Sequence, residues 1–528
     1  MEAELVHRRR WLILAVLCLS LFLIVVDNTI VNVALPSLVE QLGATSSQLA
    51  WVVDAYSLVF AGLMLAMGSL GDRYGRKGTL AIGMGLFVLT STVAAFTKNP
   101  GQLIAARAAM GIGAALIFPA TLAILANVFT DARERAKAIG LWAAVTGAAV
   151  ALGPISGGFL LKHFWWGSVF LVNLPIGIAA LVLGLVFVPT SRDPHAPAID
   201  LPGVVLSIGA ISSLVYAVIE GPRNGWASGR TLTIAAISAV LLTVFVLWER
   251  RTSHPMLDVS VFTNARFSAA SGAVMLAFFA LFGFVFMLTQ YLQFVRGYDT
   301  LAAGVRTLPF AIATGIVAPI APQLVHRIGT KIVVAAGLAF MALGLIVAAS
   351  CDASTPYRTV AIAAIIMGAG LGLTTSPATE SIMGSLPTDK AGVGSAVNDT
   401  TREVGGTLGV AVLGSLLASM YAGRFDRATA AFPLPPAARS IARESIGAAF
   451  SVADRASAQI GPQAGAAIRQ AASSSFIDGF HLGCWVAAGV ALAAAIGAYA
   501  FLPARAESRA TLDTIDDLER QFTVVRAD

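Results

Sequence analysis

Charged side chains inside long apolar stretches are the first candidates for chemistry, because an ionised group in hydrocarbon is costly and tends to face a partner or a water-filled cavity. Asp27 lies within one apolar segment, and Asp54 and Arg107 each lie near the start of a later one. A carboxylate beside a guanidinium stays ionised, whereas one alone in an apolar cavity holds a proton. Movement of Arg107 relative to Asp27 could therefore load and release a proton. The alternatives are that Asp27 and Arg107 form a pair that only fixes helix packing, and that Asp54 is a solvated helix end.

A second group of ionisable residues follows Asn398 in a later apolar segment and comprises Asp399, Arg402 and Glu403. Asp399 and Glu403 are four residues apart, so they share one face of a helix. Two carboxylates this close repel when both are ionised, which favours one of them holding a proton near neutral pH. Arg402 could relieve that repulsion. The alternative is a salt-bridged helix entrance, and for Glu380 we expect a solvated helix cap.

A short run of glycine and charge separates two apolar segments and contains Gly68, Gly71, Asp72, Arg73, Gly75, Arg76 and Lys77. Glycine permits a tight turn, and cationic side chains favour the cytoplasmic side of a membrane. An acid among them, Asp72, can pair with a neighbouring cation and lock adjacent helices. An arbitrary positively charged loop is the alternative.

A glycine-rich apolar segment includes Gly147, Gly153, Pro154, Gly157 and Gly158. Glycines four residues apart allow helices to approach closely, and proline bends a helix and frees a backbone carbonyl. Generic packing of small residues is the alternative interpretation.

Other kinds of site find no support in the sequence. No catalytic constellation is present, the stretch from Gly71 to Thr79 fails the phosphate-loop spacing, and the inner loops are too short for a nucleotide-binding domain. Cys18, Cys351 and Cys484 are widely separated, which indicates neither a metal site nor a disulfide framework. We therefore expect no enzyme activity and no cofactor, and energy from an ion gradient.

The elements that must position these residues are membrane helices. Hydrophobic residues make up 57% of the chain and charged residues 12%, with a mean hydropathy of +0.79, which excludes a soluble globule. The net charge of +6 is scattered over many short loops, so no nucleic-acid partner is expected. At roughly 20 residues per crossing, we expect fourteen spans, near 12–35, 48–70, 78–97, 102–127, 137–161, 166–188, 201–219, 231–248, 267–291, 303–325, 331–350, 358–384, 392–420 and 480–502.

The distribution of lysine and arginine predicts that both termini are cytoplasmic. The short loops on the expected outer side contain only Lys98, Lys162, Arg223, Arg230, Arg296, Arg306 and Arg358. The loops and tails on the expected inner side contain Arg8, Arg9, Arg10, Arg73, Arg76, Lys77, Arg133, Arg135, Lys137, Arg192, Arg250, Arg251, Arg266, Arg327, Lys331, Lys390, Arg505, Arg509, Arg520 and Arg526.

We expect an all-α polytopic fold built from a six-helix half at 1–190, two extra helices with linkers at 191–265, a second six-helix half at 266–502 and a tail at 503–528. The run from His326 to Lys331 can be laid over the run from Asp72 to Lys77, as expected for two related halves around a midplane site. The extra pair is expected to be peripheral. A long outer loop at 421–479 has no readable role, although Ala-rich stretches such as 438–453 could form surface helices.

These motifs together resemble the fourteen-span drug:proton antiporter family, the EmrB/QacA type, of the major facilitator superfamily. The resemblance rests on the stretches 27–36, 68–77, 107–113, 153–158, 170–177 and 405–415 and extends over nearly the whole chain. It implies that Asp27 and Arg107 serve proton coupling, that Asp72 with Arg73, Arg76 and Lys77 gates the inner face, and that Gly153 with Pro154 prevents leak. His326 replaces an acid in the second copy of the loop, so gating should rest chiefly on the first copy.

The resemblance implies a multidrug efflux pump and antibiotic-resistance protein of the bacterial cytoplasmic membrane, acting as a monomer that exchanges amphipathic drugs or toxic small molecules for protons. Asp27, Asp54, Asp399 and Glu403 outnumber Arg107 and Arg402, which favours cationic or neutral substrates. One alternative is a dedicated exporter of one antibiotic, siderophore or lipid metabolite. Another is a membrane sensor or scaffold that no longer transports.

Overall fold

The chain forms a long bundle of membrane-length helices. The computed structural model describes residues 2–503 except 43, 45, 192–199, 254, 256, 258, 387–390, 431 and 433, so the tail arginines, Arg192 and Lys390 lie outside the described residues. Within the described part, fourteen helical spans are long and apolar enough to cross a membrane, which confirms the expected number. The helices are α1 (Glu2–Leu42), α2 (Ser46–Tyr74), α3 (Arg76–Ala95), α4 (Pro100–Val128), α5 (Ala132–His163), α6 (Ser168–Leu171), α7 (Asn173–Phe187), α8 (Leu201–Asn224), α9 (Gly229–Glu249), α10 (Ala265–Gln290), α11 (Thr300–Val305), α12 (Leu308–Ile328), α13 (Thr330–Ala348), α14 (Tyr357–Met383), α15 (Ala391–Ala428), α16 (Pro436–Glu444), α17 (Ile446–Gln459) and α18 (Pro462–Phe501).

Helices form because the backbone has no water to bond within a bilayer, so each amide must bond inside its own segment. Polar residues at the ends satisfy the first amides of several helices. The Asn99 side chain accepts a hydrogen bond of 2.9 Å from the Gln102 amide at the start of α4, and Asp131 accepts from two amides at the start of α5.

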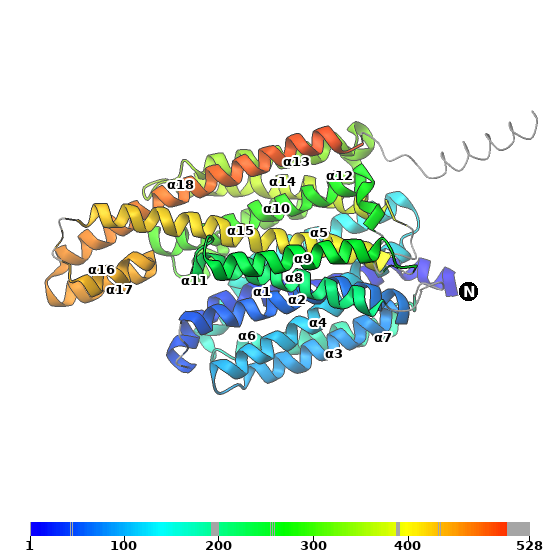
Figure 1. Ribbon diagram of the computed structural model, residues 1–528, viewed down its shortest axis with the longest axis horizontal. Helices are drawn as coiled ribbons and strands as arrows, with labels where there is room; N and C mark the ends of the chain where they lie inside the picture. Colours follow the sequence, from blue (N-terminus) through cyan, green and yellow to red (C-terminus); the bar gives the residue numbers. More distant parts are fainter. Residues whose placement is uncertain are drawn as a thin grey trace, which may run out of the picture.

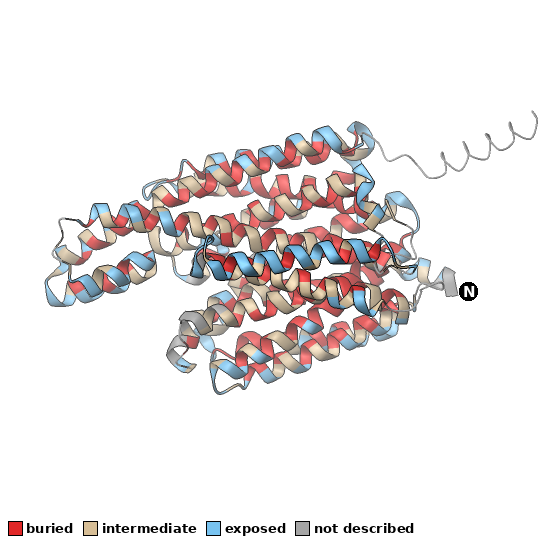
Figure 2. Ribbon diagram, in the orientation of Figure 1, coloured by how far each residue is buried: buried red, intermediate tan, exposed pale blue. Residues whose placement is uncertain are grey.

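The buried apolar side chains fall into two clusters that follow the two halves of the chain. One cluster is built almost wholly from α1 to α7 and the other from α10 to α18. Helices α2, α4 and α5 of the first half contact α11, α12, α14 and α15 of the second. Figure 2 shows the buried residues along the interior faces of the helices and the exposed ones along the outer faces. Two separately packed bodies therefore meet along one interface.

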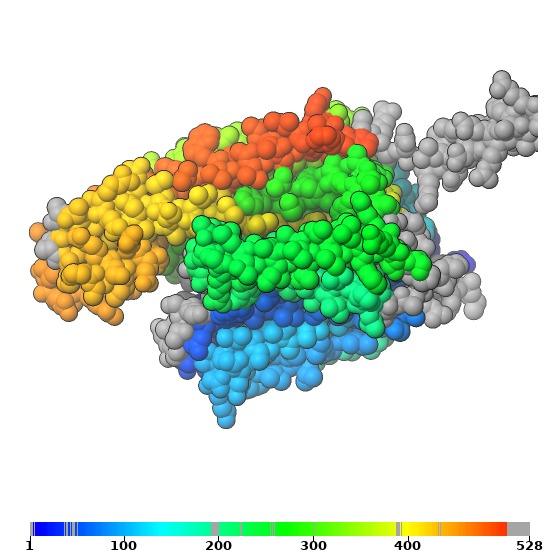
Figure 3. Space-filling model, viewed as in Figure 1, coloured from blue at the N-terminus to red at the C-terminus, as the bar shows by residue number. Residues whose placement is uncertain are grey.

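The extra helix pair lies at the outside of the bundle, and one of its two helices contacts both halves. Helix α9 packs mainly on α8, but α8 contacts both α2 of the first half and α15 of the second. Gly62 of α2 lies against Ser212 of α8, and the Trp226 indole donates a hydrogen bond of 3.0 Å to the Ser415 hydroxyl of α15. In Figure 3 the pair, in green, lies over the seam between the two halves. Helix α8 therefore bridges the halves.

The segment at 421–479, expected as a long loop, is largely helical. Helices α15 and α18 continue past the other spans, and α16 and α17 pack between their ends, so that this part projects from the bundle in Figure 1. The Tyr421 hydroxyl donates a hydrogen bond of 2.9 Å to the Ala442 carbonyl, and Ile446, Ala449 and Phe476 belong to the core of the second half. The projection is a continuation of that core.

The two copies of the charged loop have the same backbone design. Gly75 alone separates α2 from α3 and has a φ of +113°, and Gly329 alone separates α12 from α13 with a φ of +89°. Only glycine adopts such angles without strain. We call the end of the bundle that carries these two turns the basic end, because Arg10, Arg73 and Lys77 also lie there.

Gly153 allows α5 to pack closely on α1. A Cβ atom at this position would lie 1.9 Å from Thr29 Oγ1 and 3.1 Å from the Val26 carbonyl oxygen. Any side chain must therefore push the two helices apart.

We predict that Gly153→Ala destabilises the protein by about 1–3 kcal/mol, the usual cost of overpacking a close contact. The matched control is Gly85→Ala in α3, where a Cβ would meet nothing within 4 Å. The control is expected to leave the thermal midpoint in detergent unchanged or slightly higher, since alanine favours helix. Equal midpoints for the two variants would contradict the close-packing account.

Candidate functional site

An ion pair between Asp27 of α1 and Arg107 of α4 lies at the centre of the first half. Arg107 Nη1 is 2.5 Å from Asp27 Oδ2, and both side chains are 0% exposed. The Asn173 amide of α7 donates a hydrogen bond of 2.7 Å to Asp27 Oδ1, and Arg107 Nε donates to the Val52 carbonyl of α2 at 3.1 Å. The pair thus joins four helices.

Aromatic and polar groups surround this pair. The Arg107 guanidinium lies 4.3 Å from the centre of the Tyr56 ring, a cation–π contact. Asn173 also donates a hydrogen bond of 3.0 Å to the Ser91 hydroxyl, which in turn donates to the Phe170 carbonyl at 2.9 Å. Sequence reasoning assigned Asn173 no role, although an amide within the apolar 170–177 stretch was the available signal.

Asp54, the third charged residue expected at this depth, is not part of the pair. It lies two residues beyond Val52 in the early turns of α2 and is half-buried. Asp54 is therefore neither fully buried, as Asp27 is, nor a fully solvated residue at a helix end.

In the second half, Asp399 and Arg402 are both buried but form no ion pair within 4 Å. The Asn398 amide and the Ser395 hydroxyl donate hydrogen bonds to Asp399 at 2.8 and 3.2 Å. Arg402 Nη2 donates to the Thr379 hydroxyl at 2.7 Å, and that hydroxyl donates to the Asn398 side-chain oxygen at 3.1 Å. The two charges are therefore linked through neutral groups rather than by the direct pairing that was expected to relieve carboxylate repulsion.

The Arg402 guanidinium lies between two aromatic rings from different halves. Its central carbon is 4.7 Å from the centre of the Trp142 ring of α5 and 5.1 Å from that of Phe278 of α10. Trp142 is held by a hydrogen bond of 3.3 Å to the Thr121 hydroxyl. Side chains of the first half thus position a cation of the second half.

A row of aromatic rings connects the two arginines. Tyr56 and Phe60 are 5.6 Å apart, Phe60 and Phe118 are 5.6 Å apart, and Phe118 and Trp142 are 5.9 Å apart, measured between ring centres. Arg107 lies on the first ring and Arg402 on the last. The sealed ion pair and the buried arginine of the second half are therefore joined by continuous packing.

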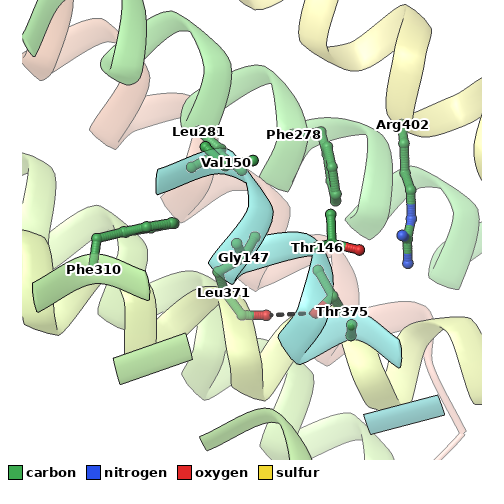
Figure 4. Close-up of a pocket in the computed structure, with 10 residues that line it drawn as sticks. Thr146, Gly147, Val150, Phe278, Leu281, Phe310, Leu371, Thr375 and Arg402 are labelled. Carbon is green, nitrogen blue, oxygen red and sulfur yellow. Dashed lines mark hydrogen bonds between the residues drawn. The ribbon is translucent and has the colours of Figure 1, made fainter. Parts of the chain in front are cut away.

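A narrow cavity lies between the halves beside this row. One part is lined by Asn28 and Thr29 of α1, by Phe60 and Phe118, and by Asp399, Arg402 and Glu403 of α15. A neighbouring part shares Thr146, Phe278 and Arg402 with the first. Figure 4 shows this second part, with Thr146, Gly147 and Val150 of α5 facing Phe278, Leu281 and Phe310 of the other half.

Glu403 provides a second polar link between the halves. Its side chain is hydrogen-bonded to that of Ser57 of α2. Glu403 is half-buried and borders the cavity, whereas Asp399 on the same helix face is only 1% exposed. The two carboxylates thus have different surroundings.

At the basic end, the charged loop of the first half contacts the second half. Asp72 and Arg76 form an ion pair of 2.7 Å and are 5% and 1% exposed. The other Asp72 oxygen accepts a hydrogen bond of 3.1 Å from the Val393 amide, in the first turn of α15. A carboxylate is favoured there by the helix dipole. His326 in the second copy of the loop is exposed.

Glu380 is not the solvated cap that was expected. Its Oε1 atom is 3.0 Å from Arg135 Nη2 of α5, and both side chains are less than one-fifth exposed. Because Glu380 belongs to the second half and Arg135 to the first, the pair crosses the interface. This pair and the contact of Asp72 both cross the interface at the basic end, and sequence alone gave no signal that Arg135 and Glu380 would pair.

The glycine-rich face of α5 meets both α1 and the second half. Gly153 and Gly157 face Thr29 and Ile30 of α1, whereas Gly147 faces Thr314 of α12 and Gly158 faces Leu301 of α11. Helix α5 therefore contributes close contacts on two sides. Among the described residues, no group of three or more His, Cys, Asp or Glu side chains could hold a metal ion.

A family model described as the Major Facilitator Superfamily matches residues 17–410. The chain belongs to this superfamily. The multidrug efflux pump LfrA of Mycolicibacterium smegmatis is 36% identical over 92% of the chain and 95% of its own length. The methyl viologen resistance protein SmvA of Salmonella typhimurium is 36% identical, covering 95% of the chain and all of the relative. The tetracenomycin C resistance and export protein of Streptomyces glaucescens is 32% identical, covering 95% and 93%.

A solved structure has a similar fold. The human organic anion transporter MFSD10 has a TM-score of 0.61 and 13% sequence identity, and the match covers 93% of this chain and 99% of the other. At that identity the likeness concerns the fold alone. This protein is thus a multi-pass membrane transporter of the superfamily, not an enzyme, and members of the superfamily generally need no cofactor.

We predict that Arg107→Met destabilises the protein by about 3–5 kcal/mol, because it leaves the Asp27 carboxylate buried without its partner. Adding Asp27→Asn should recover part of this loss, so that a double-mutant cycle gives a large coupling energy. Unfolding by denaturant in detergent measures the four free energies.

The exposed pair Arg424 and Asp478, at 3.0 Å, provides the control cycle. Its coupling should be at most about 1 kcal/mol. Equal coupling in the two cycles would mean that the buried pair does not organise the first half.

Proposed function

We propose that this protein exports amphipathic drugs or other toxic small molecules across the bacterial cytoplasmic membrane in exchange for protons. The observation that carries the proposal is the sealed pair of Asp27 and Arg107 beside a cavity that both halves line. The names of the relatives, which include a multidrug efflux pump and two resistance proteins, support efflux as the direction of transport.

Asp27 is the proposed proton carrier. A proton arriving at Asp27 would weaken its attraction to Arg107 and free the guanidinium. Asn28 and Thr29 follow Asp27 on α1 and border the cavity, so a shift of α1 that accompanies protonation alters the substrate site directly. Protonation and substrate binding would in this way exclude each other.

The basic end acts as the inner gate in this proposal. With both termini in the cytoplasm, the contacts of Asp72 with the α15 amide and of Arg135 with Glu380 hold the cytoplasmic side closed. Arg73, Arg76 and Lys77 keep the first loop on that side and orient Asp72. Opening inward requires both contacts to separate as the halves rock.

Gly153, Pro154, Gly157 and Gly158 are proposed to prevent leak through the interface. The close packing of this segment of α5 against α1 and the second half supports that role. The charge balance of Asp399 and Glu403 against Arg402 near the cavity favours cationic or neutral substrates over simple anions. The unit of transport is proposed to be the monomer, because one chain contains both halves.

A dedicated exporter of one compound is the second candidate. It is favoured by the relative named for tetracenomycin C resistance and export. Competition among unrelated dyes distinguishes a multidrug pump from a dedicated exporter. With a dedicated exporter, the dyes would not inhibit one another's transport.

In proteoliposomes, an imposed pH gradient should drive ethidium transport by the wild type, and Asp27→Asn should reduce this by at least about tenfold. The amide keeps the shape of the side chain and the contact with Asn173, but it cannot bind and release a proton as a carboxylate does. The control is Asp454→Asn, an exposed carboxylate of α17. Undiminished gradient-driven transport by Asp27→Asn would remove Asp27 from the mechanism.

Reversing Arg135 to Glu should open the basic end more often. We expect the labelling rate of Thr146→Cys by an impermeant maleimide in inside-out vesicles to rise roughly fivefold, which corresponds to about 1 kcal/mol. The background has Cys18, Cys351 and Cys484 replaced by Ala. Glu380→Arg in the same chain should restore slow labelling, and Arg443→Glu, in an exposed pair of α16, should leave it unchanged. Fast labelling in the charge-swapped protein would contradict the gate.

A further inference from the structure

Arg402 is a buried cation that interacts electrostatically with Asp399 but forms no ion pair with it within 4 Å. Arg402 is 4% exposed, and among the described residues its side chain donates one hydrogen bond to another side chain, the neutral Thr379 hydroxyl. Nε has no hydrogen-bond partner, and within the described part of the chain no carboxylate oxygen lies within 4 Å of the guanidinium. Burying a charge this way is costly unless something completes its interactions.

Two aromatic rings flank the Arg402 guanidinium. Its central carbon lies 4.7 Å from the centre of the Trp142 ring and 5.1 Å from that of Phe278. Arg402 also borders both parts of the cavity between the halves. A guanidinium edge is a fork of donors that matches the two oxygens of a carboxylate.

The rest of the cavity indicates what such an acid must be attached to. Phe60, Phe118, Phe278 and Phe282 provide flat apolar walls that suit an aromatic ring. The Glu403 carboxylate borders the same space and would repel a simple anion but attract an amine. A molecule with a ring, an acid and an amine therefore complements the aromatic walls, Arg402 and Glu403.

We propose that Arg402 is the subsite for the acidic group of the substrate, and that the cavity takes aromatic zwitterions whose amine faces Glu403. This rests on the proposed export function and refines it, because the charge count alone favours cations. Asp399 is not assigned to the ligand, since Ser395 and Asn398 already occupy its two oxygens.

The test compares three ligands with the same ring: 3-(2-naphthyl)alanine, its methyl ester, which lacks the acid, and its N-acetyl derivative, which lacks the amine. Binding to the wild type in nanodiscs, without any gradient, is followed by naphthalene fluorescence. We expect the amino acid to bind at least about tenfold more tightly than the ester and than the N-acetyl compound, the effect of one charge-assisted contact.

Variants assign each preference to its residue. Arg402→Gln should abolish the preference for the acid over the ester while leaving ester binding within about twofold, and Arg402→Lys should keep part of it. Glu403→Gln should abolish the preference for the amine over the N-acetyl compound. The matched control is Arg424→Gln on the same helix, whose guanidinium is about half exposed in a pair with Asp478.

Three results would overturn the proposal: wild type that binds the ester as tightly as the amino acid, Arg402→Gln that weakens both ligands equally, or wild type that binds ethidium but none of the three. The wild-type comparison needs no variant, so a misfolded Arg402→Gln cannot mask the answer. Loss of gradient-driven ethidium transport with an intact preference for the acid would count against proton-coupled export but not against the subsite.

Discussion

A carboxylate and a guanidinium sealed from solvent inside a membrane protein must hold each other, because each alone would cost several kcal/mol of desolvation. Asp27 and Arg107 meet this condition with an ion pair of 2.5 Å, completed by the Asn173 amide and the Val52 carbonyl. Four helices of the first half converge on that pair. Any event that changes its charge, above all the arrival of a proton, acts on the packing of all four helices.

Packing contacts connect this ion pair to the rest of the structure. Helices in lipid associate through close packing and polar contacts rather than through a hydrophobic driving force. Here α5 packs through glycine on α1 and on the second half, α8 bridges α2 and α15, and the row of rings from Tyr56 to Trp142 runs from Arg107 to Arg402. At the basic end, polar contacts of Asp72 and Glu380 cross the interface. Polar contacts between two separately packed bodies suit a transporter whose halves rock.

The fourteen spans were predictable because apolar length and the positions of Gly and charge report depth in a membrane. The closeness of Asp27 and Arg107 could be anticipated from their similar depth. Depth does not report how each helix is rotated, so the contacts of Asn173 with Asp27, of Arg135 with Glu380 and of Trp142 with Arg402 were not predictable. For the same reason Arg402 was expected near the carboxylates of its own helix, whereas its aromatic neighbours come from α5 and α10. The helices within 421–479 and the bridging place of α8 depend on tertiary packing that local composition does not encode.

In the proposed mechanism, substrate and proton compete through Asp27. This competition is tested by measuring the affinity of the purified protein for ethidium in detergent over a series of pH values, together with the protons released on binding. We expect the affinity of the wild type to fall as the pH is lowered and ethidium to displace protons there, whereas Asp27→Asn should bind ethidium without proton release from this site. Equal proton release by the two proteins, with equal ethidium bound, would contradict it.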